Sequence, residues 1–491
     1  MLAYAKYVAI LLRQSDMSRL LILLLVLLAV ACTRTDERTS TVAHPEIHDA
    51  NTLVFVTHNG PTTYFYNADN NLAGLEYDLA TLFVRDFAPE YQLKFLVVNS
   101  VSDVIPALLK GRAHIAAANL SITRLRQELV QFSTPYQETQ QQLVCFNDDK
   151  TKRNHPIKVK ALSEVLVGKK MAVPLGTSFE ERLNQLKTNQ PTLQWQALPN
   201  TNSELLLSEV ANGTLDYTVA DSHLVSIMQN YYPNLAVASA LGEPDKLAWA
   251  LSKQADPALV KKVNAFFAKI KKDGTLQHLI DRYYGHSERL NTQDVTVFLE
   301  RSQSLLPNYA ALFKQAQEQT GLDWRLIAAV SYRESHWDPL NTSPTGVRGL
   351  MMLTENTAKL MGVTDRLDPV QSIPAGAKYI VKMIETIPDS VPEPDRTYLA
   401  LAAYNIGYAH LQDARTLAKR LKLNPDRWSD VKKTLLMLRQ PDYYTTLKYG
   451  YANGSAPVVF VESVRSYQNI LEYHQPSHPQ NETSSVAQLG N

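Results

Sequence analysis

The hydropathy pattern of the chain changes near residue 290, and this change constrains the fold more than any other feature. From Leu53 onward, short apolar runs alternate with helical stretches, as in LVFVTHNG, YDLATLFVRDFA and LKFLVVN. From Thr292 to residue 474, amphipathic helical stretches follow one another. Strands alternating with helices are typical of α/β domains, and a succession of helices is typical of a mainly α domain. We therefore predict a multidomain protein, with an α/β domain at residues 51–288 and a mainly α domain at residues 292–474.

Five blocks in the first of these domains resemble a known family. They read GLEYDLA, LSITRLRQELVQFSTPY, VPLGTSFEERL, GTLDYTVAD and KKDGTLQHLIDRYYG, and they span most of residues 50–286. The blocks resemble those of the periplasmic solute-binding proteins for polar amino acids. This resemblance implies a two-lobed α/β fold that closes on a small ligand by hinge motion. It also implies that the chain leaves the first lobe near Cys145 and returns near Leu247.

The same resemblance implies a regulatory ligand site. Arg126 matches the family arginine that grips a ligand carboxylate, for which a guanidinium offers two parallel donors. Thr177 lies in the loop where the family binds that carboxylate through backbone and hydroxyl groups, and Asp221 matches the aspartate that holds the amino group. The chain departs from the family at His114, where an aspartate is usual. The alternative is that Arg124 and Arg126 form a solvated basic turn in a module that no longer binds a ligand.

The second domain contains a carboxylate in a position suited to acid catalysis. Glu334 shares an apolar face, at helical spacing, with Trp324, Ile327, Ala328 and Ser331. Burial and the negative end of the helix dipole both disfavour a charged carboxylate, so we expect the pKa of Glu334 to be raised. A carboxyl group that stays protonated near neutral pH can act as a general acid. The alternative is a structural carboxylate paired with Arg333 or Arg348.

Helix signals surround Glu334. Gly321 is expected to end one helix and Asp323 to cap the next. Pro339, Pro344 and Gly346 then predict a polar loop. The apolar run GLMMLT at residues 349–354 is expected to resume a helix.

Three sequence blocks around this helix resemble those of a second family. They read ESHWDP from Glu334, SPTGVRGLM from Ser343, and AAYNIG at residues 402–407. Their order and spacing resemble the lytic transglycosylases of the goose-lysozyme-like superfamily, and GVRGLMMLT resembles the membrane-bound type F branch in particular. The resemblance covers roughly residues 295–470 and implies a lysozyme-like fold, with Glu334 as the catalytic residue. It implies substrate contacts by Ser343, Met351, Tyr404, Asn405 and Tyr449.

The sequence offers one convincing carboxylate, whereas ordinary glycosidases use two. Asp323 is about three helical turns from Glu334, and Asp338 is expected to cap a turn. The family resemblance implies a reaction that needs only one. The N-acetyl group of N-acetylmuramic acid (MurNAc) assists bond cleavage, and the sugar 6-hydroxyl then closes a 1,6-anhydro ring. A hydrolytic muramidase and a non-enzymatic solute-binding or scaffold protein remain as alternatives.

The N-terminal residues predict export and membrane attachment. Residues 17–32 read MSRLLILLLVLLAVAC, the layout of a signal peptide, and the apolar run is short for a membrane-spanning helix. Ala29-Val30-Ala31-Cys32 resembles a lipoprotein cleavage box, so Cys32 is the candidate for lipidation. The alternatives are an ordinary signal peptide cleaved nearby and an uncleaved anchor. We expect residues 1–32 to be the signal, with Met1 or Met17 as the start, and residues 33–50 to be a polar tether. The predicted location is the periplasmic face of the outer membrane.

Composition restricts the remaining choices. The net charge of +1 over 491 residues argues against a general nucleic-acid binder. Cys145 would have no disulfide partner if Cys32 is acylated, and we expect it to be a buried free thiol. No His/Cys cluster has metal-ligand spacing, so we predict no metal or other cofactor.

The predicted partners are glycan strands of peptidoglycan, the membrane, and a small amino-acid or muropeptide ligand. The polar tail at residues 475–491 is expected to be disordered.

Overall fold

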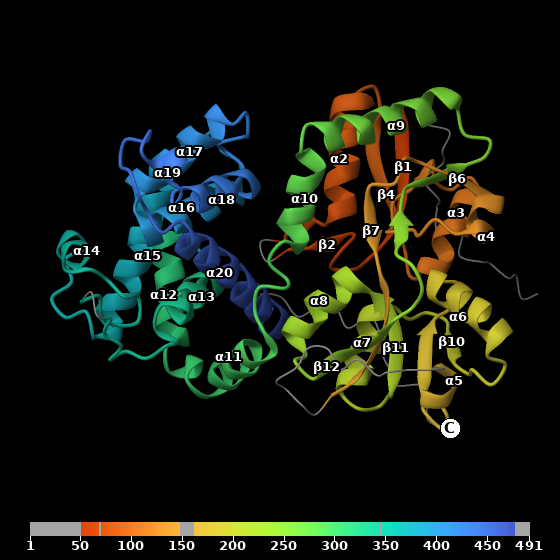
Figure 1. Ribbon diagram of the computed structural model, residues 1–491, viewed down its shortest axis with the longest axis horizontal. Helices are drawn as coiled ribbons and strands as arrows, with labels where there is room; N and C mark the ends of the chain where they lie inside the picture. Colours follow the sequence, from red (N-terminus) through yellow and green to blue (C-terminus); the bar gives the residue numbers. More distant parts are fainter. Residues whose placement is uncertain (1–50, 68–69, 148–161, 344–345, 477–491) are drawn as a thin grey trace, which may run out of the picture. The chain divides into compact units, whose positions relative to one another are not determined.

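The computed structural model describes residues 51–67, 70–147, 162–343 and 346–476 (Figure 1). The predicted signal with Cys32, the predicted tether and residues 477–491 of the predicted tail lie outside the described residues. Within the described ranges, no helix combines the length and the apolar character needed to cross a membrane.

The first lobe is built on a sheet of strand order β4-β1-β5-β14-β6. These strands are β1 (Thr52–His58), β4 (Gln92–Val98), β5 (Ile115–Ala116), β6 (Val130–Phe132) and β14 (Ala250–Ser252). The helices of this lobe are α2 (Leu75–Phe87), α3 (Val104–Leu109), α4 (Arg124–Leu129), α9 (Pro257–Lys272) and α10 (Thr275–Tyr284), with a short hairpin of β2 (Phe65–Tyr66) and β3 (Leu72–Ala73) and a 3₁₀ turn η1 (Val101–Asp103). Aromatic side chains of β1, α2 and α9 pack together, and Phe55, Phe83 and Phe266 are fully buried among them. Figure 1 shows α2 and α9 beside this sheet.

The second lobe has a sheet of strand order β10-β9-β11-β8-β12, and its apolar side chains enter two core clusters. Its strands are β8 (Gln141–Phe146), β9 (Met171–Pro174), β10 (Gln196–Leu198), β11 (Tyr217–Asp221) and β12 (Leu235–Ala240), and its helices are α5 (Leu162–Val165), α6 (Ser178–Asn189), α7 (Ser203–Ala211) and α8 (Ser222–Tyr231). Because side chains alternate along a strand, Leu143 and Cys145 enter one core cluster and Val144 enters the other. Cys145 is a buried free thiol, as the sequence predicts. Burial raises the pKa of this thiol and keeps it protonated.

The chain crosses between the lobes on two short strands. They are β7 (Gln137–Thr139) and β13 (Asp245–Leu247), which pair antiparallel. The predicted return near Leu247 is confirmed. The predicted exit near Cys145 is wrong, because Cys145 already lies within β8 of the second lobe and the crossing precedes it. Two crossing strands side by side are a common hinge for lobe closure.

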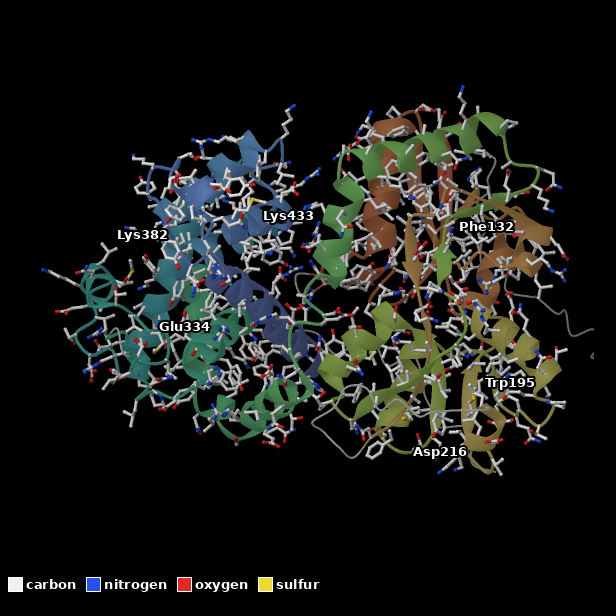
Figure 2. The ribbon with its side chains drawn as sticks, in the orientation of Figure 1. Phe132, Trp195, Asp216, Glu334, Lys382 and Lys433 are labelled. Atoms are coloured by element: carbon white, nitrogen blue, oxygen red, sulfur yellow. The ribbon has the colours of Figure 1, made fainter. Side chains whose placement is uncertain are left out.

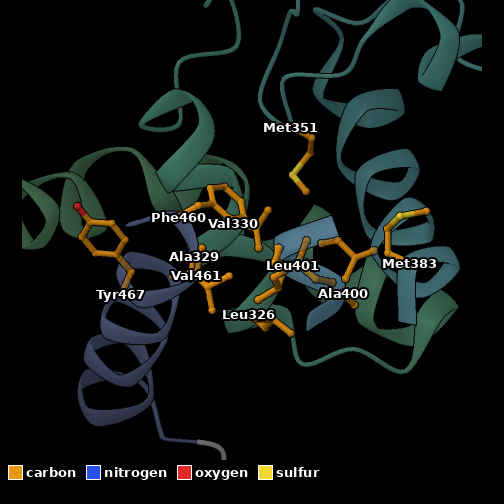
Figure 3. Packing of buried hydrophobic residues seen from close by; sticks show 14 of the residues in the cluster. Leu326, Ala329, Val330, Met351, Met383, Ala400, Leu401, Phe460, Val461 and Tyr467 are labelled. Atoms are coloured by element: carbon orange, nitrogen blue, oxygen red, sulfur yellow. The ribbon is translucent and has the colours of Figure 1, made fainter. Parts of the chain in front are cut away.

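The second domain is helical and packs around α13 (Trp324–Ser335). Its other elements are α11 (Thr292–Ser304), the 3₁₀ turn η2 (Leu306–Asn308), α12 (Ala310–Thr320), α14 (Glu355–Leu360), α15 (Pro369–Thr386), α16 (Asp395–Ile406), α17 (Tyr408–Arg420), α18 (Trp428–Met437), α19 (Pro441–Tyr444) and α20 (Ser455–His474). Figure 3 shows Leu326, Ala329 and Val330 of α13 among core side chains of α15, α16 and α20. Burying one leucine or valine side chain, such as Leu326 or Val330, stabilises the fold by about 1.5 to 3 kcal/mol. Packing therefore holds this helix firmly in the domain.

Candidate active site and ligand cleft

The helix that carries Glu334 begins and ends at the predicted signals. Gly321 closes α12 in the left-handed conformation, with φ of 76°. Asp323 caps α13 by accepting a hydrogen bond from the Arg325 amide, and its carboxylate also pairs with the Arg325 guanidinium. His336 ends the helix with φ of 53°. Glu334 is therefore fixed in the last turn, in the C-terminal domain, where Figure 2 labels it.

The Glu334 side chain is partly buried, and its environment favours the protonated form. Burial raises the pKa of Glu334 to about 7, and the nearby positive charge of Arg333 opposes this shift. Among the described residues, the Glu334 carboxyl has no hydrogen-bond or ion-pair partner, so the predicted alternative of a pair with Arg333 or Arg348 is wrong. A carboxyl group with this pKa and no internal partner can donate a proton and then accept one near neutral pH.

Three hydroxyl groups fasten the loop that faces α13. The hydroxyls of Ser331 and Ser335 both donate to the main-chain carbonyl of Leu350, at 3.1 and 3.0 Å. The Tyr404 hydroxyl donates to the next carbonyl, that of Met351, at 2.8 Å. Tyr404 also lies close enough to Glu334 for the carboxylate to help raise the tyrosine pKa, although burial is the larger cause. The loop, α13 and the end of α16 therefore meet beside Glu334.

The predicted helix at residues 349–354 is wrong. Gly349 has φ of 79° and Met352 has φ of 45°, and Arg348 and Leu353 form an antiparallel bridge. The Met352 amide donates to the Gly349 carbonyl, which closes a tight turn. A side chain at Gly349 would meet the Arg366 carbonyl oxygen at 1.8 Å, so the backbones approach here as only glycine permits. Helix α14 starts after this turn, with Thr354 as its N-cap.

The structure corrects one predicted substrate contact and locates the others. The Met351 side chain is 0% exposed and packs against Gly376, so it belongs to the core and not to a substrate surface. The neighbouring Met352 is partly exposed. Ser343 accepts a hydrogen bond from the Val347 amide within its own loop. Asn405 is exposed at the end of α16, and Tyr449 is 46% exposed, with its amide bonded to Asp413.

The two other acidic candidates have structural roles. Asp338 is exposed and accepts a hydrogen bond from the Leu340 amide, which caps a turn as predicted. Asp323 caps the opposite end of α13 from Glu334. Within the described residues, Arg333 is the only charged side chain that contributes to the pKa shift of Glu334. In the part of the domain that the structure describes, Glu334 is thus the acid–base group, and no carboxylate there is its partner.

A second site lies in the cleft between the two lobes of the α/β domain. Arg126, Thr177 and Asp221, the three residues predicted to bind a ligand, line one pocket together with Glu204 and His58. Arg126 is 5% exposed, so the alternative of a solvated basic turn is wrong. Its Nε donates to Glu181 at 2.8 Å, which joins α4 of the first lobe to α6 of the second. Ser178 and Ser121 also contact across the cleft, at 3.3 Å.

Burial shifts the titration of four side chains in this pocket. It raises the pKa of Asp221 and of Glu204 to about 7, with the Asp245 charge as a second cause for Asp221. It lowers the pKa of His58 and of His223 to about 4, so both imidazoles are neutral at pH 7. Three of these pocket residues, Glu204, His58 and His223, were not predicted from the sequence. Glu204 occupies the first turn of an ordinary amphipathic helix, and no local pattern marks it or the two histidines as pocket residues.

Two family models match the chain, one for each part of this architecture. Residues 52–286 match the bacterial extracellular solute-binding proteins of family 3, and residues 311–426 match the transglycosylase SLT domain. The solved structure of the substrate-binding protein of an amino acid ABC transporter aligns with 48% of this chain and 99% of its own, at 21% identity and a TM-score of 0.41. By the two family matches, a solute-binding module precedes a transglycosylase domain in this chain.

Curated relatives align with most of the length of this chain. A membrane-bound lytic murein transglycosylase F of Methylobacillus flagellatus is 57% identical, over 97% of this chain and 99% of the relative. Those of Nitrosospira multiformis and Pseudomonas putida are 44% and 42% identical, over 87% and 94% of this chain and 87% and 92% of their own. The chain belongs to the family of membrane-bound lytic murein transglycosylases F.

Proposed function

We propose that this chain cleaves the β-1,4 bond between MurNAc and N-acetylglucosamine in peptidoglycan, with Glu334 as its single acid–base residue. The enzyme is a lytic transglycosylase, so the products end in 1,6-anhydro-MurNAc. One observation carries the assignment of Glu334: it is a carboxyl group with a pKa of about 7 and no internal partner among the described residues, in a domain of the transglycosylase family. A single carboxyl group suffices when the substrate supplies its own nucleophiles.

The reaction requires two opposite proton transfers at Glu334. The protonated carboxyl first donates to the glycosidic oxygen while the N-acetyl group of MurNAc assists departure of the leaving sugar. The resulting carboxylate then accepts the proton of the 6-hydroxyl as that oxygen attacks the anomeric carbon. A pKa near the working pH serves both steps. Ser343, Tyr404, Asn405 and Tyr449 are proposed to contact the glycan, and Met352 replaces Met351 in that set.

Mass spectrometry of products from purified peptidoglycan tests the mechanism. Anhydro products are lighter than the corresponding reducing muropeptides by one water, about 18 Da. Glu334→Gln should abolish cleavage, and Asp338→Asn should retain it, because Asp338 only caps a turn. Reducing ends in the products would mean that water attacks, as in a hydrolytic muramidase. Retained cleavage by Glu334→Gln would refute the role of Glu334.

The pH dependence of kcat/KM provides a second test. The first step needs protonated Glu334, so kcat/KM should fall as pH rises above about 7, the value to which burial raises this pKa. A flat profile between pH 6 and 9 would be inconsistent with Glu334 as the acid.

We also propose that the interlobe cleft binds a small ligand that regulates cleavage, with Arg126, Thr177 and Asp221 at the site. The support is that these side chains line one pocket beside a two-stranded hinge. Ligand binding would shift the population of open and closed lobes. Turnover of peptidoglycan with and without a bound ligand tests this proposal, and equal rates would refute it.

Membrane attachment is a further part of the proposed function. The relatives are named membrane-bound, and the lipoprotein-like box at Cys32 supports a lipid anchor on the periplasmic face of the outer membrane. Labelling cells with a palmitate analogue should mark the protein, and Cys32→Ser should abolish the label. A wild-type protein that takes up no label would refute lipidation.

A further inference from the structure

Arg366 fastens both arms of the loop that faces α13. Its Nη1 donates to the Gly346 carbonyl at 2.8 Å and to the Leu353 carbonyl at 3.0 Å. Gly346 precedes the tight turn at Gly349 and Leu353 follows it, and Leu353 also forms the antiparallel bridge with Arg348. One nitrogen atom of Arg366 therefore ties the arm before the turn to the arm after it.

The backbone of Arg366 supports the same turn from a fixed position. A Cβ at Gly349 would lie 1.8 Å from the Arg366 carbonyl oxygen, so the two backbones are in direct contact. The segment that carries Arg366 is held on α15, because the side-chain oxygen of Gln371 accepts hydrogen bonds from the Thr364 and Asp365 amides, at 3.0 and 3.3 Å. The guanidinium thus acts from an anchored part of the domain.

The loop is held at two different places by two different sets of contacts. The hydroxyl groups on α13 and α16 act on the carbonyls of residues 350–351, beside Glu334. Residues 346–348 lie closer in the chain to Ser343. In the described ranges, the one side-chain hydrogen bond that residues 346–348 receive from beyond this loop is the bond from Arg366. Removal of Arg366 should therefore loosen the arm next to Ser343 and leave the turn beside Glu334 fastened.

We propose that Arg366 is a positioning residue for glycan binding, which keeps residues 346–353 in the arrangement that presents Ser343 and Met352 to the substrate. This inference rests on the proposal that these two residues contact the glycan. The charge of Arg366 does not contribute to the raised pKa of Glu334, so its influence passes through the loop. Binding to a loop that is already ordered avoids the cost of ordering it. Arg366 should therefore favour glycan binding more than proton transfer.

Steady-state cleavage of soluble, uncrosslinked glycan strands by the full-length protein in detergent tests this role. Arg366→Met removes both hydrogen bonds, so KM should rise about tenfold while kcat stays within about threefold of the wild type. Arg366→Gln, whose shorter side chain ends at the level of Nε, is a second loss variant and should give the same result.

The conservative variant adds a rescue. Both bonds come from the single nitrogen Nη1, and a lysine ammonium also offers several N–H donors on one nitrogen. Arg366→Lys should therefore give a KM at least about threefold below that of Arg366→Met. A KM for Arg366→Lys equal to that of Arg366→Met would overturn the role of these two hydrogen bonds.

A matched arginine elsewhere in the domain separates positioning from general stability. Arg396 donates to the Ile384 carbonyl at 3.3 Å and pairs with Asp389 at 2.6 Å, at the end of α16 opposite Tyr404. Arg396→Met should lower the free energy of unfolding, measured by urea denaturation, without raising KM. An equal rise in KM in Arg396→Met and Arg366→Met would overturn the positioning role.

The remaining outcomes distinguish this inference from the proposed reaction. An unchanged KM in both Arg366→Met and Arg366→Gln, or a loss confined to kcat, would overturn the role of Arg366 and leave the reaction at Glu334 standing. Retained cleavage by Glu334→Gln would refute the acid–base assignment and leave a KM effect of Arg366 standing.

Discussion

The Tyr404 hydroxyl donates to the main-chain carbonyl of Met351 at 2.8 Å, joining the end of α16 to the turn that faces Glu334. The ring of Tyr404 also packs with Tyr379 and Phe460. The packing fixes the ring, and the hydrogen bond uses the ring to position the turn. Through this hydrogen bond, Tyr404 of the AAYN block holds the backbone of the turn in place.

Tyr404→Phe separates these two contributions. The ring contacts remain, and loss of one hydrogen bond should lower the free energy of unfolding by about 1 kcal/mol. Because the released carbonyl belongs to the turn beside Glu334, we expect kcat to fall about tenfold with a smaller change in KM. Urea denaturation and steady-state cleavage assays measure both effects. Tyr379→Phe, which removes a hydroxyl from the neighbouring ring, serves as the control and should retain kcat.

The two serine hydroxyls on the Leu350 carbonyl should behave non-additively. Ser331→Ala or Ser335→Ala alone leaves one donor on that buried carbonyl, so each should cost less than about 0.5 kcal/mol of unfolding free energy. The double variant leaves the carbonyl without either hydroxyl and should cost about 1 to 3 kcal/mol. A double-mutant cycle by chemical denaturation gives the coupling. Additive single effects would mean that the hydroxyls act on separate groups.

The sequence predicted the helix that carries Glu334, because the signals that define this helix act between residues close together in the chain. Asp323 and Gly321 fix its start through capping and a left-handed turn, and the apolar spacing fixes its buried face. One glycine interrupts the helical stretch at residues 395–420. The structure divides it at Gly407, whose φ of 88° ends α16 before α17 begins.

The parts of the structure that the sequence did not predict depend mainly on contacts between residues far apart in the chain. The apolar run at residues 349–354 has a helical composition, but a close approach of Gly349 to the Arg366 backbone and a bridge from Arg348 to Leu353 make it a turn. The pairing of Arg126 with Glu181 joins residues 55 positions apart, in different lobes. Periodicity and local motifs carry no information on such pairs.

Two glycines with the same backbone conformation test the close approach at the turn. Gly346 and Gly349 both have φ of 79°, but a Cβ at Gly346 would meet open space and one at Gly349 would meet the Arg366 carbonyl oxygen. Gly346→Ala should cost about 1 to 2 kcal/mol for the left-handed conformation alone. Gly349→Ala should cost at least about 3 kcal/mol, because the overlap adds to that strain. Thermal and urea unfolding of the two variants provide the comparison, and equal losses would mean that the turn has room to move.

The raised pKa of Glu334 predicts that this residue destabilises the folded enzyme as pH rises. The folded protein keeps the Glu334 proton up to about pH 7, whereas the unfolded chain releases it near the ordinary value of 4.5. Between these values the folded state binds more protons, so its free energy of unfolding falls with increasing pH. Glu334→Gln does not titrate. It should therefore be more stable than the wild type at pH 8, by on the order of 2 kcal/mol, a figure reduced from the full shift because the side chain is partly solvated.

The pH series decides whether this difference comes from titration. The stability gap between Glu334→Gln and the wild type should shrink as pH falls from 7 towards 4.5, and urea denaturation at four or five pH values measures it. Glu300→Gln, an exposed change on α11, reports the effect of removing a surface charge and is subtracted. A gap that stays constant with pH would mean that the folded protein does not hold the Glu334 proton, and the general-acid role would lose its electrostatic basis. A gap that closes as described would mean that the enzyme gives up stability at neutral pH to keep an acid at this position.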